Sequence, residues 1–156
     1  MHSHQPDKPL VRRKRKGWKV LLILLGLIAI SAAGVLILDA PSRQEVSALN
    51  IGQIDFSKLA DGTYHGKFIG SKGHLRDVTV QATLKNGTLA KVTVLSGAVD
   101  SKGNPLLLNG IQSIDDLFDH VIVSQTLQVD AISGATLTSK AHLKALENAL
   151  EQAQTK

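Results

Sequence analysis

Residues 20–38 form an uninterrupted stretch of nineteen residues without a charged side chain. Only Gly26, Ser31 and Gly34 within this stretch are not strongly apolar. A helix that rises about 1.5 Å per residue would carry such a stretch across the ~30 Å hydrocarbon core of a bilayer. Basic residues precede the stretch and Asp39 follows it, and positive charge favours the cytoplasmic side of a membrane. We therefore expect one transmembrane helix over 20–38, with the amino terminus cytoplasmic and residues 39–156 extracytoplasmic.

A cleaved secretory signal is the alternative interpretation of the same stretch. Small residues that a signal peptidase accepts stand at Ala32, Ala33 and Ala40. The apolar core of a signal is usually about 7 to 15 residues long, which is shorter than this stretch. With an uncleaved anchor, the chain divides into a basic cytoplasmic tail (1–19), a transmembrane helix (20–38), a linker (39–60) and one folded domain (61–156).

The positive charge of the chain is confined to its tail. The net charge is +5, but residues 1–19 hold seven Lys or Arg and one Asp, so the tail carries +6 and the other residues −1. Aromatic residues make up 3% of the chain, too few for a surface that stacks bases. We therefore expect no nucleic-acid partner.

Two kinds of site are excluded or disfavoured by residue type and spacing. Cysteine is absent, which excludes disulfides, thiolate metal sites and iron-sulfur clusters. Beyond the tail, the histidines show no metal-ligand spacing, so we expect no metal and treat each as solvated or half-buried. These histidines are His65, His74, His120 and His142.

The folded region reads as strands followed by helices. We expect strands over 63–69, 77–84 and 89–95, and Asn86-Gly87 between the last two is a strong hairpin signal. In the third strand, simple alternation places Leu89 and Leu95 on one face and Val92 and Val94 on the other. Apolar residues at helical spacing then predict helices near 114–122 and 137–152. The expected fold class is α+β, a small antiparallel sheet with packed helices.

The segment between the two expected helices contains the most informative residues, 130–139, with the sequence DAISGATLTS. Gly134 permits a positive φ or a close backbone approach, and four hydroxyl side chains surround the start of a helix. Free amides and the positive end of a helix dipole suit a phosphate group. An ordinary helix cap explains the same residues, and the pattern alone leaves both interpretations open.

This decapeptide resembles the flavinylation motif Asp-x-x-Ser/Thr-Gly-Ala-Thr/Ser of the FMN-binding domain family. That family includes the C subunit of sodium-translocating NADH:quinone oxidoreductase and the G subunit of the Rnf complex. The opening Asp61-Gly62-Thr63-Tyr64, the pair Gly70 and Gly73, and the Asn86-Gly87 hairpin are also similar to the start of that domain. The resemblance covers roughly residues 61–153.

The resemblance implies a cofactor and its attachment point. In the family, a flavin transferase that uses FAD and Mg²⁺ joins the phosphate of FMN to the last hydroxyl of the motif, which here is Thr136. Asp130 would then help recognition by the transferase or organise the loop, and Thr138 and Ser139 would bond the phosphate or cap the helix. Tyr64 and Gly73 are candidate neighbours of the flavin ring. The implied cofactor-binding residues are Thr136, Ser133, Gly134, Ala135, Asp130, Thr138, Ser139, Tyr64 and Gly73.

The implied function is that of a membrane-anchored extracytoplasmic flavoprotein that carries electrons through covalent FMN. Its partners would be the membrane, the flavin transferase during maturation, and donor and acceptor proteins that the sequence does not name. Two alternatives remain at this point. One is a flavin-dependent reductase of a small acceptor, and the other is a cofactor-free surface interaction module.

Overall fold

A computed structural model describes residues 16–154 of the chain. The basic tail lies almost wholly outside the described residues. The chain divides into two compact units, residues 1–38 and 39–156. Residues 39–60, the expected linker, are grouped with the second unit.

Helix α1 (Lys16–Ser47) runs through the predicted transmembrane stretch and continues into the second unit. Among residues 16–154, no helix reaches the length and hydropathy needed to cross a bilayer, so the transmembrane prediction is not confirmed. The helix continues through Pro41, which removes one backbone donor, because its last turns pack on the domain. Ser42 is 2% exposed and Val46 is 1% exposed. Burial of these two side chains explains why the chain stays helical up to Ser47.

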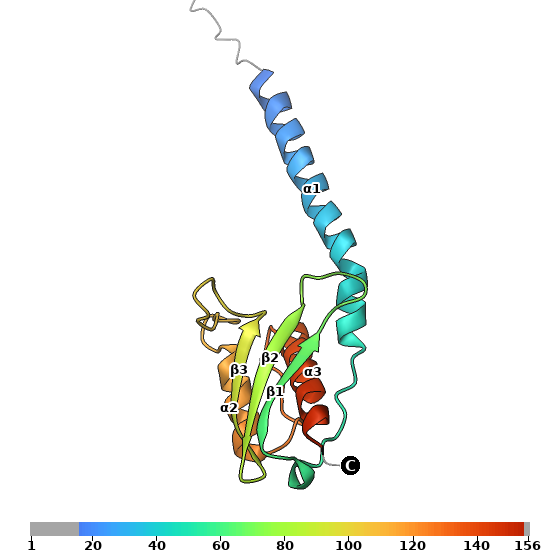
Figure 1. Cartoon of the computed structure of the whole chain (residues 1–156). Helices are drawn as coiled ribbons and strands as arrows, with labels where there is room; N and C mark the ends of the chain where they lie inside the picture. Colours follow the sequence, from blue (N-terminus) through green and yellow to red (C-terminus); the bar gives the residue numbers. More distant parts are fainter. Residues whose placement is uncertain (1–15, 155–156) are drawn as a thin grey trace, which may run out of the picture. The chain divides into compact units, whose positions relative to one another are not determined.

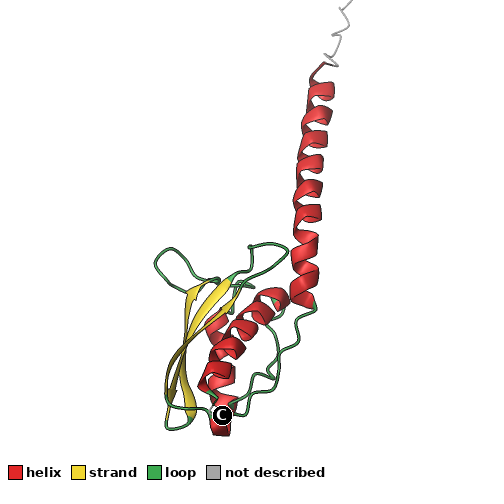
Figure 2. Cartoon of the chain, turned by 45° about the vertical axis from the view of Figure 1, so that its right-hand side comes forward, coloured by secondary structure: helices red, strands yellow, loops and turns green. Residues whose placement is uncertain are grey.

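The second unit has one three-stranded antiparallel sheet with strand order β1-β2-β3. Its strands are β1 (Gly62–Phe68), β2 (Val78–Lys85) and β3 (Thr88–Ser96), and a short helix η1 (Phe56–Lys58) precedes them. Helices α2 (Ile114–Ser124) and α3 (Thr136–Ala153) follow the sheet. Figures 1 and 2 show both of these helices on the same side of the sheet. The predicted α+β fold, three strands and two helices are confirmed.

The hydrophobic core lies between the sheet and the two helices. Strand β2 alternates as predicted, with Val78, Val80, Ala82 and Leu84 all buried. The expected apolar stripe of α3 is also buried: Leu143, Leu146, Leu150 and Ala153. Gly66 of β1 lies so close to α3 that an added Cβ would overlap the carbonyl oxygen of Ala145. A glycine at this position therefore sets the distance between sheet and helix.

Strand β3 departs from the predicted alternation because it contains two extra residues, Ala90 and Leu95. Thr83 of β2 pairs with Lys91, whereas the next residue, Leu84, pairs with Leu89, so Ala90 has no partner of its own. Beyond such a bulge, the side chains that point to each face of the sheet are shifted by one residue. Leu89 and Val94 therefore both enter the core, at 1% and 7% exposure, although the sequence predicts opposite faces for them. The second extra residue, Leu95, has no partner because Val80 pairs with Val94 and Thr79 with Ser96, and it is 48% exposed.

Candidate functional site

The predicted flavinylation motif begins with a tight turn immediately before α3. The amide N–H of Ala135 donates to the carbonyl oxygen of Ile132 at 2.9 Å. Gly134, the third residue of this turn, has φ +77°, a conformation that suits glycine and strains other residues. The requirement for glycine at this position is therefore a property of the turn itself.

Ser139 holds this turn against the first turn of α3. Its hydroxyl accepts a hydrogen bond from the Ile132 amide at 3.1 Å and donates to the Ala135 carbonyl at 3.0 Å. The residue is 0% exposed. The predicted contact between Ser139 and a phosphate is thus not supported, because the hydroxyl is buried and already used. Its role here is to fix the shape of the loop.

The start of α3 has no side-chain cap. Its N-cap residue is Ala135, which offers no oxygen to the first-turn amides. The first backbone bond into the helix runs from the Ser139 amide to the Ala135 carbonyl. Within residues 16–154, the amides of Thr136, Leu137 and Thr138 have no acceptor. Three unsatisfied donors at the positive end of an 18-residue helix form an anion-binding site.

Thr136 is the first residue of α3 and its side chain is exposed. Ser133 and Gly134 are also exposed, and Ala135 is buried at 8% exposure. The motif therefore presents one threonine hydroxyl directly beside three free amides. Asp130 is exposed too, and the structure gives its carboxylate no contact with this helix start.

A cavity of about 350 Å³ opens beside the first turn of α3, and we call it the α3 cavity. Its walls come from the end of the 69–77 loop with the start of β2, the residues that directly follow β3, Leu108, and α3 itself. The residues that matter below are Arg76, Val78, Gly97, Ala98, Thr138 and His142. Thr138, in the first turn of α3, contributes both one of the free amides and part of the cavity wall, so the cavity borders the anion-binding helix start at this residue. Sequence reasoning anticipated Thr138 and missed the other five.

His142 is the most constrained polar group in this cavity wall. Its Nδ1 lies 2.7 Å from the Thr138 carbonyl oxygen, and its Nε2 accepts from the Ala98 amide at 3.3 Å. A carbonyl can only accept and an amide N–H can only donate, so these partners fix the neutral ring with its proton on Nδ1. Burial lowers the pKa of His142 from 6.5 to about 4.

The prediction that His142 is solvated or half-buried is wrong, since the residue is 1% exposed. Its spacing of four residues from Leu146, a member of the apolar stripe, was the available signal for burial. Gly97 belongs to the same arrangement, because a Cβ at this position would lie 2.9 Å from His142 Nε2. The glycine is therefore required by the close approach of the imidazole.

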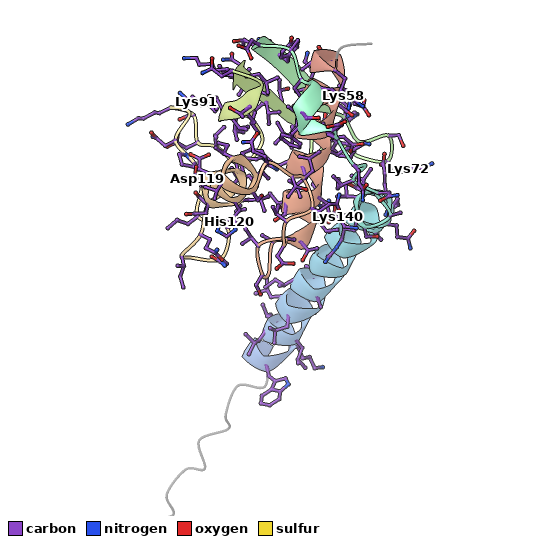
Figure 3. The ribbon with its side chains drawn as sticks, turned by 90° about the horizontal axis from the view of Figure 1, so that it is seen from below. Lys58, Lys72, Lys91, Asp119, His120 and Lys140 are labelled. Atoms are coloured by element: carbon purple, nitrogen blue, oxygen red, sulfur yellow. The ribbon has the colours of Figure 1, made fainter. Side chains whose placement is uncertain are left out.

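A second, more open depression of about 710 Å³ lies between α2 and residues 126–133, and we call it the acidic groove. Three carboxylates line it: Asp116, Asp119 and Asp130. Asp119 and His120 lie together on α2 in Figure 3. The α3 cavity is lined by one cation, Arg76, and one carboxylate, Asp77, whereas the groove is lined by three carboxylates. The α3 cavity is therefore the less negative of the two and opposes an anionic ligand less.

Tyr64 and Gly73 differ from the other predicted residues in their placement. Tyr64 lies near the start of β1, where its hydroxyl donates to the Ala60 carbonyl at 3.2 Å. The α3 cavity adjoins the opposite end of the sheet, at Val78 and Gly97, so Tyr64 is not brought to the motif. Gly73 lies in the 69–77 loop against Ser42 and does not line the α3 cavity.

These features define a class of site: an uncapped helix start for a phosphate, next to a cavity for the remainder of a cofactor. The family model of the FMN-binding domain matches residues 73–151, and the chain belongs to that family. FMN is therefore the ligand supported for this domain. An uncharacterized protein of Treponema pallidum (strain Nichols) is 26% identical over 98 residues, covering 63% of this chain. The chain spans about a quarter of that relative's length.

Proposed function

We propose that this protein is an electron-carrying flavoprotein in which FMN is joined through a phosphoester to the hydroxyl of Thr136. The single observation that carries the proposal is an exposed threonine beside three free amides at an uncapped helix start. The amides would hold the phosphate oxygens, and the helix dipole would favour their negative charge. The flavin would supply the redox chemistry, and the chain would supply attachment and environment.

The attachment step needs a second protein, a flavin transferase, with FAD as donor. The Thr136 oxygen would form a bond to the FMN phosphorus, while the pyrophosphate bond of FAD breaks. AMP would leave, and the hydroxyl proton would be lost to solvent or to a base of the transferase. The free amides near Thr136 support this step because they can stabilise negative charge on the phosphoryl oxygens.

We infer that the flavin ring occupies the α3 cavity rather than the acidic groove. Reduction places negative charge on a flavin ring, and the groove presents the carboxylates of Asp116, Asp119 and Asp130. The α3 cavity instead pairs the single carboxylate of Asp77 with the cation of Arg76, and its histidine is neutral. Thr138 belongs both to the first turn of α3 and to the wall of this cavity, so a cofactor with its phosphate at the helix start would have its ring near the cavity.

We also propose that the domain works at the extracytoplasmic face of a membrane. The support is the charge-free stretch 20–38 between a basic tail and Asp39. Donor and acceptor proteins would then meet the flavin outside the cytoplasm. Alkaline extraction of membranes from cells that express the full chain tests the association, because a peripheral protein is released and an anchored one is retained.

Intact mass under denaturing conditions tests the attachment. The full chain is produced together with a flavin transferase, and we expect a mass gain of one FMN less one water that maps to the peptide containing Thr136. Thr136→Val should abolish the gain, whereas the matched control Thr63→Val, at an exposed threonine of β1, should retain it. Flavin retained covalently in Thr136→Val would refute the assignment. Flavin released from the wild-type chain on denaturation would show a non-covalent site.

A further inference from the structure

The 69–77 loop, which forms one wall of the α3 cavity, is held by the end of α1. The Glu45 carboxylate accepts from the Ser71 and Lys72 amides, each at 2.8 Å. The Asp77 carboxylate, within the loop, accepts from the Gly70 amide at 2.9 Å. The loop is therefore anchored at several points, and its cavity-facing residues have fixed positions.

The strongest of these anchors is an ion pair between Arg76 and Asp39. Two parallel bonds join Arg76 Nη1 to Asp39 Oδ1 at 2.7 Å and Arg76 Nη2 to Asp39 Oδ2 at 2.9 Å. Arg76 Nη1 also donates to the hydroxyl of buried Ser42 at 3.2 Å. The two charged side chains are 19% and 16% exposed, so water screens them only in part. The Asp39 carboxylate raises the pKa of Arg76, which stays charged.

Arg76 lines the α3 cavity, and Asp39 does not. A flavin ring in this cavity would therefore lie next to the positive member of the pair and farther from the negative one. Asp77 also lines the cavity, with its carboxylate bonded to the Gly70 amide and to His74 at 2.9 Å. Its charge stays the same whichever member of the pair is changed, so it does not alter the comparison between variants.

We propose that Arg76, oriented by Asp39, is a positioning residue that sets the reduction potential of the flavin bound in the α3 cavity. This inference rests on the proposed function. Uptake of two electrons and one proton converts the neutral oxidised ring into a reduced ring with one negative charge. A nearby positive charge stabilises the reduced form and raises the potential, and its counter-ion moderates the effect.

The two members of the pair therefore give opposite expected results. Asp39→Asn leaves the Arg76 charge without its counter-ion, so the potential should rise. Arg76→Gln removes the positive charge, so the potential should fall. In the double variant the potential should lie between those of the two single variants. A general loosening of the loop would instead move both single variants in the same direction.

In the experiment, the full flavin-loaded chain is equilibrated with dithionite and a dye of known potential. The solution potential is fixed at the value where the wild-type flavin is half reduced. Visible absorbance gives the reduced fraction, which should exceed one half in Asp39→Asn and fall below one half in Arg76→Gln. Glu45→Gln is the control, because Glu45 holds the same loop and does not line the cavity, so its reduced fraction should stay near one half. Melting curves report whether each variant is folded.

Three outcomes overturn the inference: unchanged potentials in both single variants, shifts of the same sign in both, or a Glu45→Gln shift equal to that of Asp39→Asn. If Arg76→Gln does not fold, Arg76→Lys keeps the charge, and its potential should stay near wild type while that of Asp39→Asn rises. A wild-type chain without flavin overturns the proposed function as well. Flavin on Thr136 with shifts of the same sign overturns only the inference about Arg76.

Discussion

His142 should make the stability of the domain depend on pH between 7.5 and 5. The ring is neutral in the folded protein, with a pKa of about 4, and an unfolded chain has the ordinary value of 6.5. Below pH 6.5 His142 therefore binds a proton in the unfolded chain but stays neutral in the folded protein. The free energy of unfolding then falls as the pH falls. The full difference between the two pKa values corresponds to about 3 kcal/mol, of which about 2 kcal/mol is lost by pH 5.

The structure separates this effect from acid unfolding driven by carboxylates. Hydrogen bonds to backbone or side-chain donors lower the pKa values of Asp61, Asp77, Asp100 and Asp116, so their contributions are lost only below about pH 4.5. Urea unfolding of residues 39–156, followed by circular dichroism at pH 7.5 and 5, measures the difference. His142→Leu should be less stable at pH 7.5 and lose most of the dependence, whereas exposed His65→Gln should retain it. Equal wild-type stability at the two pH values would refute the reasoning.

Three further predictions concern the packing and the loop. Gly66→Ala should cost more than about 2 kcal/mol of unfolding free energy, because the new Cβ overlaps the Ala145 carbonyl; Gly26→Ala, whose Cβ meets nothing within 4 Å, should cost nothing measurable. Ser139→Ala leaves the buried Ile132 amide without its acceptor and should cost about 1–3 kcal/mol, with slower flavin attachment measured by mass. Ser101→Ala, at an exposed serine outside the motif, should attach flavin at the wild-type rate. Ala135→Asp should reduce flavin attachment measured by mass, because its carboxylate competes for the free amides and repels the phosphate. A melting curve reports whether this variant is folded, since position 135 is buried, and a folded variant with unchanged attachment would contradict the anion-binding site.

The sequence predicted the regular elements well because each has a periodic apolar pattern. The alternation of β2, the Asn86-Gly87 hairpin and the stripe of α3 all depend on neighbours close in sequence, and all are confirmed. The bulge at Ala90 was missed because it depends on how β2 and β3 pair across the sheet. The sequence predicted a linker over 39–60 with at most a short helix, because Pro41 suggests a break. Helix α1 instead continues to Ser47, since tertiary packing of Ser42 and Val46 outweighs that preference.

The candidate site was predictable only where its residues are consecutive. Residues 130–139 form one local motif, and its placement at the start of α3 follows from the sequence. The α3 cavity instead combines Arg76, Gly97 and His142, which are far apart along the chain. Nothing in their local patterns marks them as neighbours. Tyr64 was proposed from resemblance alone, and its hydroxyl bonds the Ala60 carbonyl near the start of β1.

The bonds made by Ser139 have a consequence for transplanting the site into other proteins. The turn from Ile132 to Ala135 and the hydroxyl that secures it lie within eight consecutive residues, so the geometry around Thr136 is encoded almost entirely by that peptide. Ile132 and Ser139 are buried at 4% and 0% exposure, however, which means that the peptide needs an apolar surface beneath it. A recipient protein should therefore accept the motif at the start of a helix packed on a core, and not in a free tail.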